Sequence, residues 1–449
     1  MKKYFLLICI ALLAGLFSAC EKFLDEKSDK KLAVPATLAD LQSMLDNFGN
    51  LNHNMPSSGE ISSDNYYLLD ADLNSISQEG LRRMYVWEKD HLFAPGSSSN
   101  DWNYLFRAVY ISNAVLEGLD NHPAADTEVR HLKSQALFFR AFAYHDAAQI
   151  WALAYDPTTA AIDLGIPLRL NTDFNEASER GNVQQTYSLI ESDLKQAIAH
   201  LPLKSTHVVR PSRAAAYGLL ARVYLNKRDY EQAGAYADSC LRLYNTLIDY
   251  NTLNAAASVP IARFNPEIIL ERLLNSPSMV LSARIVPELY GQYEDNDLRK
   301  TVLFKRNTDG TFSFKGGYGG SPAYYGGITT DEMFLIRAEC FARKGNTNAA
   351  LADLNTLLAK RWKTGTYASR TAPNPQKALE MVLFERRKEL LMRGLRWADL
   401  KRLNKEGANI TLTRKANGTS YTLAPNDLRY ALPIPDDVIA LSGMTQNYR

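Results

Sequence analysis

The sequence lacks the short motifs by which hydrolases and metalloproteins are commonly recognised. It has no H-E-x-x-H, no G-x-S-x-G and no cysteine or histidine cluster at metal-binding spacing, and its seven histidines are scattered. One S-x-x-K, Ser28 to Lys31, falls in a polar stretch near the N-terminus. A glycosidase needs only two convergent carboxylates, so a glycoside hydrolase stays open as the least favoured alternative. No catalytic residue, metal or cofactor is predicted.

Cysteine and net charge are also low. Cys9 lies in the N-terminal apolar stretch, whereas Cys240 and Cys340 lie in separate helical patterns, where two buried thiols are favoured over a disulfide. The net charge is +2, and setting aside Lys2 and Lys3 leaves 49 basic and 49 acidic residues. A neutral chain argues against nucleic acid as a partner.

The N-terminal hydrophobic run is short. Lys2 and Lys3 precede an apolar stretch, Tyr4 to Leu16, that falls short of the about 20 residues that a spanning helix needs. Small residues then lead to Cys20, a pattern similar to the bacterial lipobox. We therefore predict a lipoprotein signal peptide over residues 1–19, and Cys20 as the lipidated residue. An ordinary secreted protein with a chance cysteine is the alternative.

Helical patterns dominate the rest of the chain and come in pairs with small residues where the helices would cross. The pairs are Leu132–Trp151 with Tyr187–Leu201, Ser212–Lys227 with Glu231–Tyr244, and Thr330–Lys344 with Asn348–Arg361. Such pairs predict a mainly α fold of tetratricopeptide-like helix-pair repeats with irregular loops and a few short β-hairpins.

The same pass along the chain suggests four regions. They are the signal peptide, a tether over residues 20–35, an N-terminal helical region over 36–250 and a C-terminal region over 251–449 with a loop insertion at 251–328. Short strands and an Asp309-Gly310 turn are expected within the insertion.

Aromatic residues on loops are the candidate ligand contacts. The glycine-rich run Gly316 to Gly327 could let tyrosine faces meet a flat ligand, and no phosphate-binding Lys-Ser or Lys-Thr follows it. A second loop with nearby aromatics precedes the first long helix. The candidate ligand-binding residues are Asp64, Tyr66, Tyr67, Trp87, Tyr318, Tyr324 and Tyr325.

A charged stretch from Asn374 to Asn404 organises the C-terminal region. Asn374 is a candidate helix N-cap with Pro375 behind it, and Gly394 is a candidate stop. Its charged residues alternate with bulky apolar ones, which favours a partly buried ion network over a solvated face. The structural residues predicted here are Glu385, Arg386, Glu389, Arg396, Trp397, Asp399 and Arg402.

This stretch, ERRKELLMRGLRWADLKRL, resembles the signature of the RagB/SusD family of surface nutrient-binding lipoproteins. Similar family patterns occur at Cys20-x-x-Phe23-Leu24-Asp25, in the helix Asp101 to Leu119 and near the C-terminus at Pro433-Ile434-Pro435 and Gln446-Asn447.

The resemblance implies a protein that is not an enzyme. It implies capture of an oligosaccharide or another oligomeric nutrient at the outer membrane, held there through a lipid anchor, and delivery to a partner TonB-dependent β-barrel transporter. A peptide-binding member of the family, or a repeat scaffold that binds a protein, are the alternatives.

Overall fold

The computed structural model describes residues 35, 37–53, 55–97, 100–275, 279 and 282–449. The predicted signal peptide, Cys20, the tether up to residue 34 and the S-x-x-K motif lie outside the described residues. In the part of the chain that is described, no helix is both long enough and apolar enough to cross a membrane.

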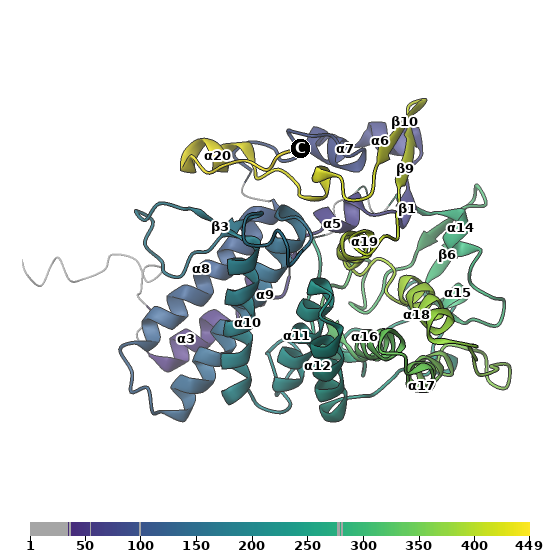
Figure 1. Cartoon of the computed structure of the whole chain (residues 1–449), viewed down its shortest axis with the longest axis horizontal. Helices are drawn as coiled ribbons and strands as arrows, with labels where there is room; N and C mark the ends of the chain where they lie inside the picture. Colours follow the sequence, from purple (N-terminus) through teal and green to yellow (C-terminus); the bar gives the residue numbers. More distant parts are fainter. Residues whose placement is uncertain (1–34, 36, 54, 98–99, 276–278, 280–281) are drawn as a thin grey trace, which may run out of the picture.

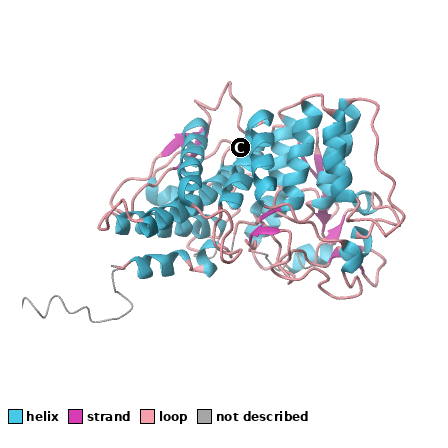
Figure 2. Ribbon diagram, turned by 90° about the horizontal axis from the view of Figure 1, so that it is seen from below, coloured by secondary structure: helices cyan, strands magenta, loops and turns pink. Residues whose placement is uncertain are grey.

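Long helices form the body of the molecule (Figures 1 and 2). They are α8 (Asp101–Leu119), α9 (Thr127–Trp151), α10 (Val183–His200), α11 (Arg213–Lys227), α12 (Tyr230–Leu243), α16 (Thr330–Arg343), α17 (Thr347–Leu358) and α18 (Pro375–Glu389). Each packs on its neighbour in turn, α9 on α10, α11 on α12, α16 on α17 and on α18. The predicted helix-pair array is confirmed.

Local sequence explains where these helices begin and how closely they pack. The side chains of Asn182, Ser212, Asp229 and Asn346 each accept a hydrogen bond from a backbone N–H in the first turn of the helix that follows. On α11 the small residues Ala214 to Ala216 are fully buried. Alanine at these positions lets α11 lie close to its neighbours.

Shorter helices lie between and beyond these. They are α3 (Leu38–Leu45), α4 (Phe48–Leu51), α5 (Ser58–Ser62), α6 (Asp70–Ser75), α7 (Glu79–Tyr85), α14 (Pro287–Tyr290), α15 (Arg299–Val302), α19 (Arg396–Asn404) and α20 (Asp436–Ser442). Helices α6, α7 and α20 lie at the top of Figure 1, above the long helices.

The described strands pair into five two-stranded antiparallel sheets. The pairs are β1 (Tyr66–Tyr67) with β5 (Arg284–Ile285), β2 (Leu164–Pro167) with β3 (Arg180–Asn182), β4 (Ile268–Leu270) with β8 (Ile328–Thr329), β6 (Phe304–Arg306) with β7 (Phe312–Phe314), and β9 (Leu412–Ala416) with β10 (Thr419–Leu423). The β1–β5 pair ties the N-terminal third of the chain to the insertion.

The core consists of one large apolar cluster and a smaller one. The large cluster runs from Leu41 to Met444, and the smaller one lies between α16, α17 and α18. Trp102, Trp151 and Trp397, which the sequence placed in helical patterns, are all buried. Cys240 and Cys340 are buried free thiols, as expected.

A buried ion cluster lies under α18. Arg299 contacts Asp297 at 2.7 Å, Glu385 at 2.7 Å and Glu389 at 2.8 Å, and Arg361 contacts Glu389 at 2.7 Å. Both arginine side chains are 0% exposed. We call these five residues the α18 ion cluster. Glu385 and Glu389 thus lie in a buried ion network, with arginine partners that come from outside the signature stretch.

A second cluster joins α18 to α19 and α16. Arg402 contacts Glu339 at 2.6 Å and Asp399 at 2.8 Å, while Arg386 contacts Asp399 at 2.9 Å. Helix α18 ends at Glu389, five residues before Gly394, because the chain turns there to bring Asp399 beside Arg386. Gly394 has a φ of +71° in that turn, which suits glycine.

Replacing Arg299 by Met should destabilise the fold strongly. The change removes the guanidinium that three buried carboxylates share and leaves them with Lys388 and Arg361 as cations. Breaking a buried ion pair in this way costs about 3–5 kcal/mol. Denaturant unfolding followed by circular dichroism measures the loss. Arg242→Met is the matched control, because Arg242 is 78% exposed beside Asp238 and should lose less than about 1 kcal/mol. Equal losses in the two variants would contradict the prediction.

Candidate functional site

A groove of about 880 Å³ opens among the short helices above the N-terminal end of α8. This volume lies within the roughly 300–1,000 Å³ range of ligand sites. The side chains that line it come from α5, α6, α7, the loop before α8, the start of α8 and the segment before β5. They include Ser57, Ser58, Ile61, Asp72, Ser75, Ser77, Gln78, Glu79, Met84, His91, Phe93, Ser97, Asn100, Asp101, Tyr104, Asn275 and Ser282.

Asp101 fixes the floor of the groove. Its carboxylate accepts hydrogen bonds from the backbone N–H groups of Ser57 at 2.9 Å and Ser58 at 2.7 Å, and from the Ser58 hydroxyl at 2.5 Å. Burial raises the pKa of Asp101. The three hydrogen bonds to its carboxylate lower the pKa but do not fully offset the effect of burial. The contacts hold the start of α5 against the start of α8.

The loop before α8 is held from both ends. Asn100 caps α8 by accepting from Asn103 N at 2.9 Å, and its amide donates to Ser97 O at 3.1 Å. Asp437, next to the start of α20, accepts from Gly96 N at 2.9 Å. The rim of the groove is therefore tied to the C-terminal helix, although the two are more than 300 residues apart.

The described lining residues of the groove include no lysine or arginine. Its charged groups are Asp72, Glu79 and Asp101, with His91 as the single basic side chain among those residues. Asp72 is paired with Arg284 at 2.7 Å, from outside the groove. Serine, asparagine and glutamine outnumber the charged residues among the described lining. Such a site suits a neutral ligand that is rich in hydroxyl groups, and it offers no guanidinium or ammonium group to bind an anion.

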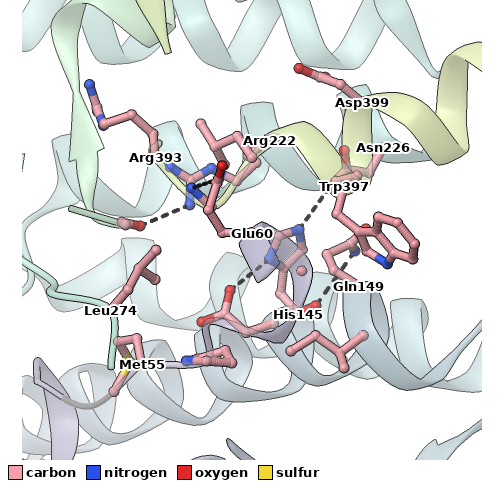
Figure 3. Close-up of a pocket in the computed structure, with 18 of the residues that line it drawn as sticks. Met55, Glu60, His145, Gln149, Arg222, Asn226, Leu274, Arg393, Trp397 and Asp399 are labelled. Carbon is pink, nitrogen blue, oxygen red and sulfur yellow. Dashed lines mark hydrogen bonds and ion pairs between the residues drawn. The ribbon is translucent and has the colours of Figure 1, made fainter. Parts of the chain in front are cut away.

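A smaller cavity of about 50 Å³ lies deeper, where α5, α9, α11 and the α18–α19 turn meet (Figure 3). Within it His145 Nε2 is 3.0 Å from the Asn226 amide nitrogen, and Arg272 contacts Asp146 at 2.6 Å. Burial lowers the pKa of His145, which keeps the imidazole neutral. A water molecule occupies about 30 Å³ in the liquid, so this space suits one or two waters and is too small for a sugar.

The three predicted tyrosines of the glycine-rich loop are enclosed by protein. Tyr318 is 2% exposed, Tyr324 4% and Tyr325 1%. The Tyr318 hydroxyl donates to Glu267 at 2.5 Å, and the guanidinium of Arg393 lies 4.4 Å from the Tyr318 ring centroid.

The glycines of this loop allow close packing. A Cβ on Gly327 would lie 2.0 Å from Leu270 O, and one on Gly320 would lie 2.4 Å from Arg263 N. Gly320 also has a φ of +62°. The loop thus lies against the β4 region with its tyrosine rings turned inward.

The other predicted ligand residues lie behind one wall of the groove. Tyr66 is 1% exposed and Trp87 3%, and the Trp87 indole donates to Ser62 O at 2.9 Å. Tyr67 is half-buried in β1. Asp64 pairs with Arg396 at 2.7 Å and with Arg387 at 3.0 Å. None of these four residues is among the described lining of the groove.

Sequence reasoning missed the groove itself. The run Asp70, Asp72, Asn74 resembles the start of a calcium loop that lacks its glycine and final acid, and it folds as the short helix α6, of which Asp72 lines the groove. Tyr104, near the start of α8, is half-buried and lines the groove, and no pattern along the sequence singled it out. Among the described residues no group of three or more histidine, cysteine or acidic side chains could hold a metal ion.

Two protein-family models match most of the chain. Residues 22–225 match a model described as "Starch-binding associating with outer membrane", and residues 242–449 match one described as "SusD family". The chain belongs to the SusD family. This is a family of non-enzymatic binding proteins, which confirms that the chain is not an enzyme. The name of the first model indicates association with the outer membrane.

Individual relatives are distant in sequence but close in fold. SusD-like protein P38 of Formosa agariphila is 23% identical over 388 residues, 69% of this chain and 74% of the relative. A SusD superfamily protein from Bacteroides thetaiotaomicron is 20% identical, with a TM-score of 0.71 over 92% of this chain and 100% of that one. A laminarin-binding SusD-like protein is 18% identical, with a TM-score of 0.66 over 91% of this chain and 98% of that one. At these identities the two structures show a shared fold.

The stability of this SusD-family chain should fall in acid through Asp64. Burial alone would raise the pKa of Asp64, but Arg396 and Arg387 more than offset it and bring the pKa to about 2. An unfolded aspartate has a pKa of about 3.9, so the carboxylate stabilises the fold by about 2–3 kcal/mol above that pH. This contribution is lost as the pH falls from about 4 through 2.

Urea unfolding between pH 7 and pH 2 checks this expectation. Asp64→Asn should be less stable than the unmodified protein at pH 7, and the difference should shrink as the pH approaches 2. The exposed carboxylate Glu231 supplies the control, since Glu231→Gln should run parallel to the unmodified protein throughout. A difference for Asp64→Asn that stays constant with pH would refute the assignment.

Proposed function

We propose that this protein is a surface-exposed lipoprotein that binds a neutral oligosaccharide in the groove and delivers it to a partner TonB-dependent transporter in the outer membrane. The observation that carries the proposal is the groove of about 880 Å³, whose described lining is rich in hydroxyl and amide groups and lacks lysine and arginine. Membership of a family of binding proteins, with a family model named for starch binding at the outer membrane, supports it.

The chemistry of the groove fits a sugar chain in two ways. Hydroxyl groups of a sugar need convergent polar partners, which Ser77, Gln78, Asn275 and Ser282 of the described lining can supply. The apolar C–H face of a sugar ring packs on an aromatic ring, and the half-buried Tyr104 at the start of α8 offers one. Anionic sugars should bind less well, because they would face the carboxylates of Asp72 and Glu79 and the described lining has no lysine or arginine to pair with them.

In this proposal the predicted residues Tyr66 and Trp87 support the wall of the groove and do not contact the ligand. Tyr66 and Trp87 donate hydrogen bonds to the backbone of α5, at Ile61 O and Ser62 O. Ser58 of α5 and Met84 of α7 line the groove. Asn275 and Ser282 bring the predicted 251–449 region to a site built mainly by the 36–250 region. The groove therefore depends on both predicted regions being folded together.

The anchor rests on the sequence alone. Each buried CH₂ of an acyl chain contributes about 0.8 kcal/mol, and stable attachment takes two chains or one chain with a second signal. A diacylated Cys20, reached through a tether over residues 20–35, would satisfy this condition and leave the folded part free at the surface.

Replacing Tyr104 by Ala should lower the affinity for neutral oligosaccharides about 3- to 10-fold, because the aromatic face for one sugar ring is lost. Isothermal calorimetry with starch-derived and laminarin-derived oligosaccharides, beside uronate and sulfated ones, measures this effect. Tyr448→Ala is the matched control, since Tyr448 is 72% exposed outside the groove. Preferential binding of the anionic sugars, or of peptides, would rule out the neutral-glycan assignment.

Replacing Cys20 by Ala should move the protein from the membrane fraction to the soluble fraction, because the acylated side chain is then missing. Sedimentation and metabolic labelling with a fatty acid report the change. Replacing Cys9 by Ala keeps the predicted lipidated residue and should leave both readouts unchanged. A Cys20→Ala protein that still sediments and still incorporates lipid would defeat the anchor assignment.

A further inference from the structure

An exposed pair of aromatic rings lies on α8 beyond the groove. Phe174, in the loop between β2 and β3, is 84% exposed, and its ring stacks on that of Tyr110 with centroids 5.4 Å apart and planes at 24°. Tyr110 is itself 41% exposed. Leu170 of the same loop is 54% exposed. Exposed apolar groups gathered in this way mark interaction sites.

The loop that carries Phe174 is fixed to α8. The amide of the buried Asn113 donates to Arg169 O at 3.0 Å and to Asn171 O at 3.2 Å. One turn further along α8, Glu117 accepts from the backbone N–H of Thr172 at 2.7 Å. Side chains of α8 therefore hold the backbone of the loop before Phe174 at Arg169, Asn171 and Thr172.

These contacts continue into the core. Arg140 of α9 donates to Asn113 Oδ1 at 3.0 Å and pairs with Asp193 of α10 at 2.8 Å. The position of the loop is thus set through Asn113 by a buried arginine and by two further helices. A ring that is held in place before binding loses little conformational entropy when a ligand stacks on it.

Helix α8 connects the ring pair to the groove. Tyr104 lines the groove, Arg107 follows three residues later and Tyr110 three residues after that. Residues three apart on a helix are surface neighbours. The Arg107 guanidinium lies 6.0 Å from the Tyr104 ring centroid, and six residues of helix span about 9 Å. Six residues of a helix with 3.6 residues per turn also turn Tyr110 by about 120° from Tyr104, so a ligand that leaves the groove would cross α8 past Arg107 to reach Tyr110 and Phe174.

We propose that Tyr110 and Phe174 form a second sugar-binding subsite, which holds a further unit of an oligosaccharide that extends out of the groove. This proposal rests on the proposed function. The outward face of the Phe174 ring takes the C–H face of a sugar ring. The exposed side chains of Asn175, next in the loop, and Arg107, three residues before Tyr110 on α8, offer donors to its hydroxyl groups.

The size of the patch favours a sugar over a protein partner. A fully buried aromatic side chain covers roughly 150–250 Å², so the exposed parts of the two rings offer about 250 Å² together. A standard protein interface buries about 800 Å² on each partner. The ring pair is large enough for one or two sugar units and covers a minor part of a protein interface.

The test compares long and short oligosaccharides on the purified protein. Size series of neutral β-1,3-glucan oligosaccharides and of malto-oligosaccharides serve as probes, with affinities measured by calorimetry. Phe174→Ala and Tyr110→Ala should each weaken binding of the long chains about 3- to 30-fold and leave short chains unchanged. Tyr104→Ala should weaken both. Ile162→Ala is the matched control, because Ile162 is 78% exposed on the segment before β2 and should change neither affinity.

Each contrary result has its own meaning. Long-chain affinity that survives both Phe174→Ala and Tyr110→Ala, while Tyr104→Ala still weakens binding, overturns the second subsite and leaves the proposed function standing. Absence of binding to every glucan overturns both proposals. Unchanged glycan binding by Phe174→Ala, with loss of an outer-membrane protein that copurifies with the unmodified chain, assigns the ring pair to a protein partner and overturns the sugar subsite.

Discussion

Burial of charge is the constraint on which the rest of this structure depends. A charged group that leaves water is costly unless an opposite charge and hydrogen bonds meet it in the interior. Arg299 and Arg361 are 0% exposed and meet Glu385 and Glu389 of α18 from segments that lie 28 to 90 residues away. The helix and its partners must therefore fold together, since any one of them alone would bury an unpaired charge.

The same requirement extends from the signature stretch to the groove. Arg396 and Arg387 pair with Asp64, and the backbone N–H of Gly394 donates to Glu60 of α5 at 2.9 Å. The opposite end of α5 is held by Asp101 at the floor of the groove. A short helix of five residues has little stability of its own. Its place is fixed by buried carboxylates at both ends, so the C-terminal signature positions an N-terminal ligand wall.

Local signals could predict the helix pairs and half of the ion network, but not the site. The cap at Asn374 and the spacing of Glu385 and Glu389 are visible along the chain. Arg299 comes from α15, a helix of four residues far from them in the sequence, which no local pattern predicted. The groove draws its described lining from side chains between Ser57 and Tyr104 and from Asn275, Met279 and Ser282. The two segments are brought together beside the β1–β5 pair. The loop tyrosines were predicted to contact a ligand, but Tyr318 contacts the buried carboxylate of Glu267 and the guanidinium of Arg393. Such partners depend on tertiary contacts, which local sequence does not reveal.

The proposed role also limits how tightly the groove should bind. A delivery protein has to release its cargo, so a few modest contacts serve it better than a deep pocket. Hydrogen bonds to neutral hydroxyl groups contribute about 0.5–1.5 kcal/mol each, because they replace bonds to water. The absence of lysine and arginine from the described lining removes charge-assisted bonds from those cationic donors. The Tyr110–Phe174 ring pair further along α8 would then raise affinity for long chains through linked contacts, each weak enough to release in turn.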